Sequence, residues 1–136
     1  STYGHWPHSG EIDIMENVGF EPDSVVASVH TAAHNFSLGT QKNNKLKLSS
    51  VSNEFHTYTL EWYPEKLVFS VDKEEYFVYQ NEDKGYEQWP FDQPMYLILN
   101  IAYGGNWGGL QGLEPEKLPQ QMEIDYVRVY QDTNAL

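Results

Sequence analysis

The sequence has 136 residues, of which 20 are acidic and 8 basic, so its formal net charge at neutral pH is -12. A field of that sign repels phosphate backbones and anionic headgroups, which argues against nucleic acid and membrane surfaces as partners. The chain holds no cysteine, so disulfide frameworks and thiolate metal sites are excluded. We expect a single domain over residues 1–136, because a chain of this length buries enough surface for one core.

Short runs of β-branched and aromatic residues recur between Gly, Pro, Asn and Asp clusters along the whole chain. This pattern is typical of strands, and no long helical stripe accompanies it. Residues 72–74 predict a hairpin turn, and residues 83–89 predict one helical turn. Many short strands at roughly even spacing favour an antiparallel sandwich or jelly roll over an α/β fold. The predicted strands, in chain order, are residues 10–16, 24–31, 45–49, 55–62, 66–71, 75–79, 95–102 and 122–131.

The segment SGEIDIMEN, residues 9–17, carries three carboxylates on an otherwise apolar strand. Glu11 and Asp13 share one face of a period-2 strand, whereas strict alternation would place Glu16 on the other face. A bulge at Ile14-Met15 adds one residue and returns Glu16 to the face of the other two acids. The sequence therefore predicts one acidic face and one core face. The plain alternative is an exposed acidic strand, and the particular spacing argues against it.

The expected strand geometry predicts how far apart the two glutamate carboxyls lie. Because the bulge absorbs one residue, four strand steps of ~3.3 Å separate the Glu11 and Glu16 Cα atoms, which gives about 13 Å. The two glutamate side chains lean inward by ~4 Å each, so their carboxyls lie about 5 Å apart. That separation is typical of retaining glycosidases, since inverting enzymes need roughly 6.5 to 9.5 Å. Like charges raise the pKa of the least solvated acid, so one proton is retained near neutrality for a leaving group. Spacing alone does not decide which glutamate keeps it.

Residues 3–16, YGHWPHSGEIDIME, resemble the signature of glycoside hydrolase family 16, and the inserted Met15 resembles its laminarinase-like branch. Residues 55–62, 100–107 and 125–130 are similar to the family's downstream strands, in the family's order. The resemblance implies a concanavalin-like antiparallel β-sandwich jelly roll with a cleft along its concave face. Family members usually have about as many residues again before the catalytic strand. We therefore expect this chain to be the C-terminal portion of the usual catalytic domain, without its N-terminal strands.

The resemblance also implies an activity and a set of roles. It implies retaining endo-hydrolysis of laminarin-type β-1,3-glucan or of mixed-linkage β-1,3-1,4-glucan. Carried over residue by residue, it makes Glu11 the nucleophile, Asp13 its helper and Glu16 the acid/base catalyst. It implies no cofactor for catalysis, and a structural calcium held in part by Asp125, whose oxygens suit a hard cation.

The implied substrate and the missing strands suggest where the protein acts and what it binds. A polymer that cannot enter cells implies a secreted or extracellular protein, with the periplasm and the cell surface as variants. Half of a sandwich leaves apolar faces and strand edges uncovered, so we expect a second chain, a second copy or a further fragment to cover them.

Four more residues are candidates for substrate binding. Trp6 and Trp107 lie in loops, where a large ring suits a stacking platform for sugar. His30 lies on the strand expected beside the catalytic one, and Asn100 is a polar break in an apolar run. A core position for Trp6 and a purely structural role for His30 are the alternatives. His34 and Tyr103 are weaker candidates, His5 and His8 give only a weak metal signal, and Trp62 and Trp89 are expected in the core.

Two rival functions remain open from the sequence. The first keeps the family and changes the substrate to agar, carrageenan or another galactan. The second is a β-glucan recognition module that binds without cutting. Such modules typically lose the catalytic glutamates, whereas Glu11 and Glu16 are both present here.

Overall fold

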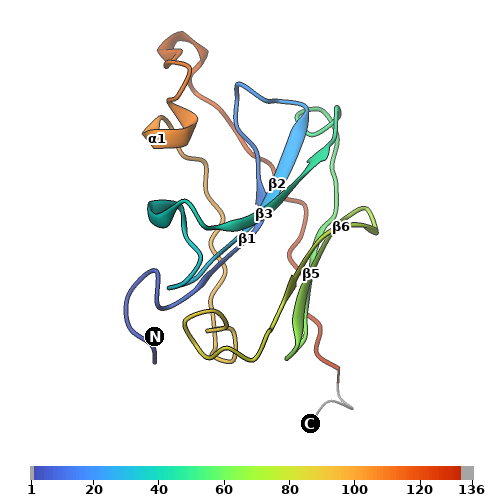
Figure 1. The fold of residues 1–136 in the computed structure, drawn as a ribbon. Coiled ribbons are helices and arrows are strands. Elements are labelled where there is room, and N and C mark those ends of the chain that lie inside the picture. The colour runs from blue at the N-terminus through green and yellow to red at the C-terminus, as the bar shows by residue number, and fades with distance from the viewer. Residues whose placement is uncertain (1, 133–136) are drawn as a thin grey trace. The chain divides into compact units, whose positions relative to one another are not determined.

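The structure is a computed structural model that describes residues 2–132 (Figure 1). The chain divides into two compact units, Ser1–Leu97 and Ile98–Leu136. In the described part of the chain, all strands lie in the first unit and form two three-stranded antiparallel sheets. The all-β, antiparallel fold class is therefore confirmed, while the single domain stays a prediction.

The first sheet has the order β1-β2-β3, with β1 at Glu11–Glu16, β2 at Ser24–His30 and β3 at Lys42–Lys47 (blue to teal in Figure 1). The central strand β2 is buried on both of its faces. Its Val25, Ala27 and Val29 side chains are fully buried, and successive strand residues point to opposite faces. Ser28 and His30 consequently share the other face of β2. The polar run that opens β3 has low strand propensity, and its pairing with β2 overrides that preference.

The second sheet has the order β4-β5-β6, with β4 at Tyr58–Trp62, β5 at Lys66–Val71 and β6 at Glu74–Gln80. The predicted hairpin is confirmed, with Asp72 and Lys73 as its two turn residues. Their φ angles are 50° and 77°. Two positive φ angles define the type I′ turn, whose twist matches the twist of the flanking strands.

Buried side chains from both sheets form one hydrophobic core in the first unit. Its members are Ala27, Val29, Leu67, Phe69, Tyr79, Trp89 and Phe91, with Ile12 packed against them from β1. Trp89 is buried, as expected. Trp62 is 43% exposed, so its predicted core position is wrong. Its indole N–H donates to the Phe91 carbonyl at 3.0 Å, which holds the ring at the edge of the core.

Two of the predicted strands are wrong: neither residues 95–102 nor residues 122–131 form a strand. A strand needs a neighbour for its N–H and C=O groups, and none of the described residues forms a ladder with either segment. Tyr96 is 85% exposed and Val129 is 90% exposed.

Short helical turns account for the rest of the regular structure. The second unit contains, among its described residues, only the short helices α1 at Gly105–Gly108 and η2 at Pro115–Lys117. In the predicted turn at residues 83–89, the Trp89 N–H donates to the Gly85 carbonyl at 3.0 Å, one turn that does not continue into a helix.

Candidate active site

The ladder between β1 and β2 contains the predicted bulge. Asp13 pairs with Ser28 and Glu16 pairs with Val26, so three steps along β1 match two steps along β2. One extra residue therefore lies at Ile14-Met15, as the sequence predicts. Because side chains alternate with period 2, the extra residue moves Glu16 to the face that it would otherwise miss.

The contacts of the three acids show that they share this face. Glu11 lies opposite His30, and Asp13 lies opposite Ser28, two residues of β2 that point to the same side. The Ser28 hydroxyl donates to Glu16 Oε2 at 2.7 Å. The strand therefore has the predicted acidic face, while Ile12 packs against the core on the opposite face.

Trp6 is the neighbour of Glu11. Its indole N–H donates to Glu11 Oε2 at 2.5 Å, and its ring stays 39% exposed. Burial and the nearby Asp13 charge raise the pKa of Glu11, and the Trp6 hydrogen bond opposes them. This one hydrogen bond favours the ionised form of Glu11, but burial and like charge outweigh it.

Glu16 has a similar environment with a different partner. Burial, followed by the Asp13 charge, raises the pKa of Glu16, and the Ser28 hydrogen bond lowers it. Both glutamates therefore hold a proton to higher pH than a free glutamate does. A departing oxygen requires a shift in this direction, and retention of a proton near neutrality stays a prediction.

His30 is the basic residue of the cluster. It is only 8% exposed, and its Nε2 lies 3.4 Å from Asp13 Oδ2. The Asp13 carboxylate raises the pKa of His30, and a charged His30 in turn lowers the pKa of both glutamates. The other ring nitrogen, His30 Nδ1, is buried without a hydrogen-bond partner among residues 2–132. His30 is thus an electrostatic member of the site.

One group of side chains has the donor set for a metal. Ligand atoms of Glu11, Asp13 and His30 lie within 4.8 Å of one another, the only such group of three or more His, Cys, Asp or Glu side chains in the part of the chain that the structure describes. Calcium prefers six to eight oxygen ligands, so this trio with its imidazole does not fit that ion. Asp125 belongs to no such group, and calcium binding there stays a prediction.

The structure brings together Glu11, Asp13, Glu16, Trp6 and His30 in the first unit. The remaining predicted site residues, Asn100, Trp107 and Asp125, lie in the second unit and stay predictions.

Two further residues at the acidic face are absent from the sequence predictions, namely Ser28 and Phe36. The two-residue period of a strand was a signal for Ser28, since it places that hydroxyl on the face of His30. Phe36 lies in a loop, where no periodicity applies.

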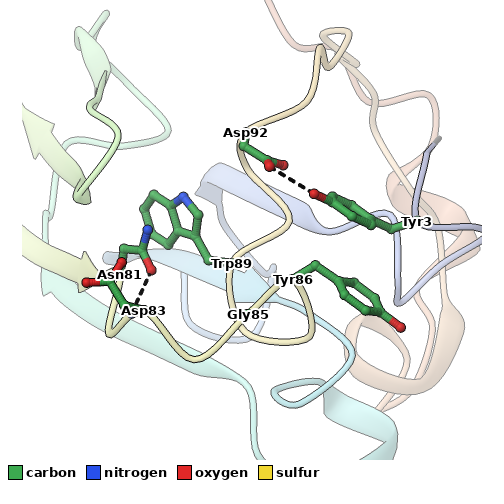
Figure 2. Close-up of a pocket in the computed structure, with 7 residues that line it drawn as sticks. All are labelled: Tyr3, Asn81, Asp83, Gly85, Tyr86, Trp89 and Asp92. Carbon is green, nitrogen blue, oxygen red and sulfur yellow. Dashed lines mark hydrogen bonds between the residues drawn. The ribbon is translucent and has the colours of Figure 1, made fainter.

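An open pocket of about 280 Å³ lies beside the segment that precedes β1 (Figure 2). Tyr3 stacks on Tyr86 with ring centroids 4.7 Å apart, and its hydroxyl donates to Asp92 Oδ2 at 2.8 Å (Figure 2). None of the three acids lines this pocket. Its contacts instead anchor the segment that carries Trp6 to Tyr86 and Asp92, in the loop after β6.

The fold and the acidic face together define an all-β protein with a carboxylate centre of the kind that glycosidases use. The sequence matches the model of Glycosyl hydrolases family 16 over residues 2–128. The chain belongs to glycoside hydrolase family 16, which confirms the resemblance seen in its motifs.

Similar proteins place the chain in the laminarinase-like branch. A beta-glucanase of Rhodothermus marinus is 49% identical, over 95% of this chain and 48% of that protein. Glucan endo-1,3-beta-glucosidase A1 of Niallia circulans is 34% identical, over 97% of this chain and 20% of that protein. The X-ray structure of the laminarinase from Rhodothermus marinus aligns with a TM-score of 0.85 and 47% identity, over 88% of this chain and 50% of that one. The jelly-roll fold class is thereby confirmed, and the chain spans about half the length, or less, of the relatives it matches.

No described helix is long and apolar enough to cross a membrane.

Proposed function

We propose that this chain carries the catalytic centre of a retaining endo-β-1,3-glucanase that also accepts mixed-linkage β-1,3-1,4-glucan. The observation that carries the proposal is the bulge in β1, which places Glu11, Asp13 and Glu16 on one face. A pair of carboxyls is the machinery that retaining glycosidases require. The names of the similar proteins from Rhodothermus marinus and Niallia circulans support the β-glucan substrate.

The proposed reaction is a double displacement. Glu16 donates its proton to the departing glycosidic oxygen while the Glu11 carboxylate attacks the anomeric carbon, which forms a covalent glycosyl-enzyme. Glu16, now ionised, then takes a proton from water as that water attacks the anomeric carbon and frees Glu11. Raised pKa values suit Glu16 for the first step, and the Trp6 N–H stabilises the ionised Glu11 that attacks.

Reducing-end release from laminarin tests the activity. Glu11→Ala is expected to abolish release with the fold intact, whereas Glu65→Ala, an exposed glutamate in the turn between β4 and β5, is the matched control and is expected to keep it. Proton NMR of the first-formed anomer tests the stereochemistry, and an inverted product would contradict the double displacement.

A polysaccharide panel separates the proposal from its two rivals. Activity on laminarin and mixed-linkage glucan is the expected result. Activity on agarose or carrageenan alone would replace the β-glucan substrate with a galactan. Binding of β-glucan without any release of reducing ends would support a recognition module.

We further propose that additional polypeptide completes the sandwich, and that the complete protein is secreted. Residues 95–102 support the first point, because they are mostly apolar and exposed but form no strand in the described part of the chain. Residues 122–131 have a strand-like composition and form no strand there either. The proposed polymeric substrate supports secretion, because a polymer cannot enter cells. Intact mass and native mass of the material from its source test whether a partner polypeptide accompanies the chain.

A calcium titration measured by calorimetry, on the wild type and on Asp125→Ala, tests whether Asp125 binds a structural calcium.

A further inference from the structure

Phe36 is a large apolar side chain that stays exposed beside the acidic face. It opens the 3-10 helix η1 at Phe36–Leu38 and is 58% exposed. Its ring lies 5.0 Å from the Trp6 ring and 5.8 Å from the His30 ring, measured between centroids. Trp6 donates to Glu11 and His30 lies opposite Glu11 in the ladder, so Phe36 borders the site.

The loop around Phe36 is built to hold it there. Asn35 is 2% exposed, and its side-chain N–H groups donate to the carbonyls of Thr31 at 3.0 Å and Ala32 at 3.3 Å. Its side-chain oxygen caps η1 by accepting the Leu38 N–H at 3.2 Å. Gly39 closes the turn in the left-handed region, at φ 67°. A buried amide thus fixes the backbone on both sides of an exposed aromatic ring.

Trp6 and Phe36 pack against each other next to Glu11 and together expose an aromatic surface, the Trp6 platform. Their ring centroids are 5.0 Å apart and their planes are inclined by 33°, so part of each ring covers the other and the rest stays exposed. A pyranose presents a flat face of C–H groups, and a partly exposed aromatic surface buries such a face favourably. The exposure of both rings leaves them available to a ligand that lies along the acidic face.

We propose that Phe36 is a substrate-contacting residue that extends the Trp6 platform and binds a glucosyl unit of the β-glucan beyond the two that flank the cleaved bond. The inference rests on the proposed function, because it takes the β-glucan as the ligand. It adds a contact in the loop after β2, which belongs to neither the catalytic strand nor the segment before it. The ring contributes to substrate binding, so its removal weakens the binding of long substrates more than the binding of short ones.

The test compares Phe36→Ala with Leu38→Ala. Leu38 lies in the same short helix and is 62% exposed, so it controls for loss of exposed apolar area in this loop. KM and kcat are measured on laminarin and on a short β-1,3-gluco-oligosaccharide, together with the pH profile of kcat/KM. Loss of one buried aromatic contact predicts about a 10-fold rise in KM on laminarin for Phe36→Ala, with a smaller rise on the short substrate. Phe36→Tyr, which keeps the ring, and Leu38→Ala are expected to stay within about 3-fold of the wild type.

Two kinetic results would overturn the inference. The first is an unchanged KM in Phe36→Ala, or a rise that Leu38→Ala reproduces. The second is a shifted pH profile with unchanged KM, which would make Phe36 a positioning residue that acts through Trp6 or His30.

A binding measurement separates failure of the inference from failure of the proposed function. Calorimetry with a long β-1,3-gluco-oligosaccharide compares Glu11→Gln with the double variant that adds Phe36→Ala. If the wild type releases no reducing ends but the double variant binds about 10-fold more weakly, the contact stands and the proposed hydrolysis fails. If the wild type hydrolyses laminarin and the two variants bind equally, the hydrolysis stands and the contact fails. Absence of any binding overturns the contact.

Discussion

Ser28 donates its hydroxyl to Glu16 Oε2 at 2.7 Å, across the ladder between β1 and β2. The partner of Ser28 in that ladder is Asp13, and Glu16 reaches the same face only because the bulge adds a residue between them. A serine on the neighbouring strand thereby adjusts the protonation of the proposed acid/base catalyst.

Ser28→Ala is expected to move the alkaline limb of the kcat/KM profile to higher pH. The Ser28 hydrogen bond favours the ionised carboxylate and lowers the pKa of Glu16, so its loss raises that pKa further above the ordinary glutamate value. Glu16 then stays protonated, and active as an acid, to higher pH. The profile is measured on laminarin, with Ser24→Ala at the start of β2 as the control. A limb that stays in place, or moves to lower pH, would contradict this assignment of the acid.

Glu11→Gln is expected to raise the melting temperature at pH 7 while it abolishes activity. Burial and Asp13 raise the pKa of Glu11, so its contribution to stability is full below the unfolded pKa of about 4.3 and is lost as pH rises through the folded pKa. At pH 7 the ionised group therefore destabilises the fold, and an amide removes that charge. Melting curves at pH 7 and near pH 4 measure the difference, which is expected to disappear at the lower pH. Glu65→Gln should change neither curve.

Lys73→Gly is expected to stabilise the β5-β6 hairpin by about 0.5 to 1 kcal/mol. Lys73 has a φ of 77°, a conformation that costs a side-chain-bearing residue strain and costs glycine none. Asp-Gly is moreover a favoured pair in type I′ turns. Urea unfolding measures the change. Glu74→Gly, one residue later and inside β6, is expected to destabilise, and equal effects of the two glycines would argue against the turn.

Gly10→Ala is expected to destabilise the protein by roughly 1 to 3 kcal/mol and to lower kcat. Gly10 has a φ of 72°, and an added Cβ would lie 2.6 Å from Pro90 Cγ and 2.8 Å from Phe91 Cε1. Relief of that clash displaces the start of β1, where Glu11 follows directly.

Gly39→Ala is the control, because its φ of 67° is similar but no heavy atom lies within 4 Å of its added Cβ. It is expected to cost only the backbone strain, about 1 kcal/mol. Urea unfolding and kcat on laminarin measure both variants, and equal losses would show that the clash is unimportant.

The local sequence pattern predicted the strands well where the partner strand is nearby in the sequence. The bounds of β5 match the predicted residues 66–71, and the hairpin to β6 follows directly. The segments at residues 95–102 and 122–131 have the same strand-like composition but form no strand. Composition reports a preference for extended backbone, whereas a ladder requires a second strand at hydrogen-bond distance, and no described segment provides one.

The sequence by itself determined that Glu11, Asp13 and Glu16 share one face, because one extra residue in EIDIME can keep three acids on one face only through a bulge. Only the tertiary structure decided what surrounds those acids. Ser28 reaches Glu16 from the neighbouring strand, and Phe36 approaches Trp6 from a loop 30 residues further along the chain. Spacing along one strand follows from backbone geometry that every residue shares, whereas contacts between distant segments depend on how buried faces and caps position the loops.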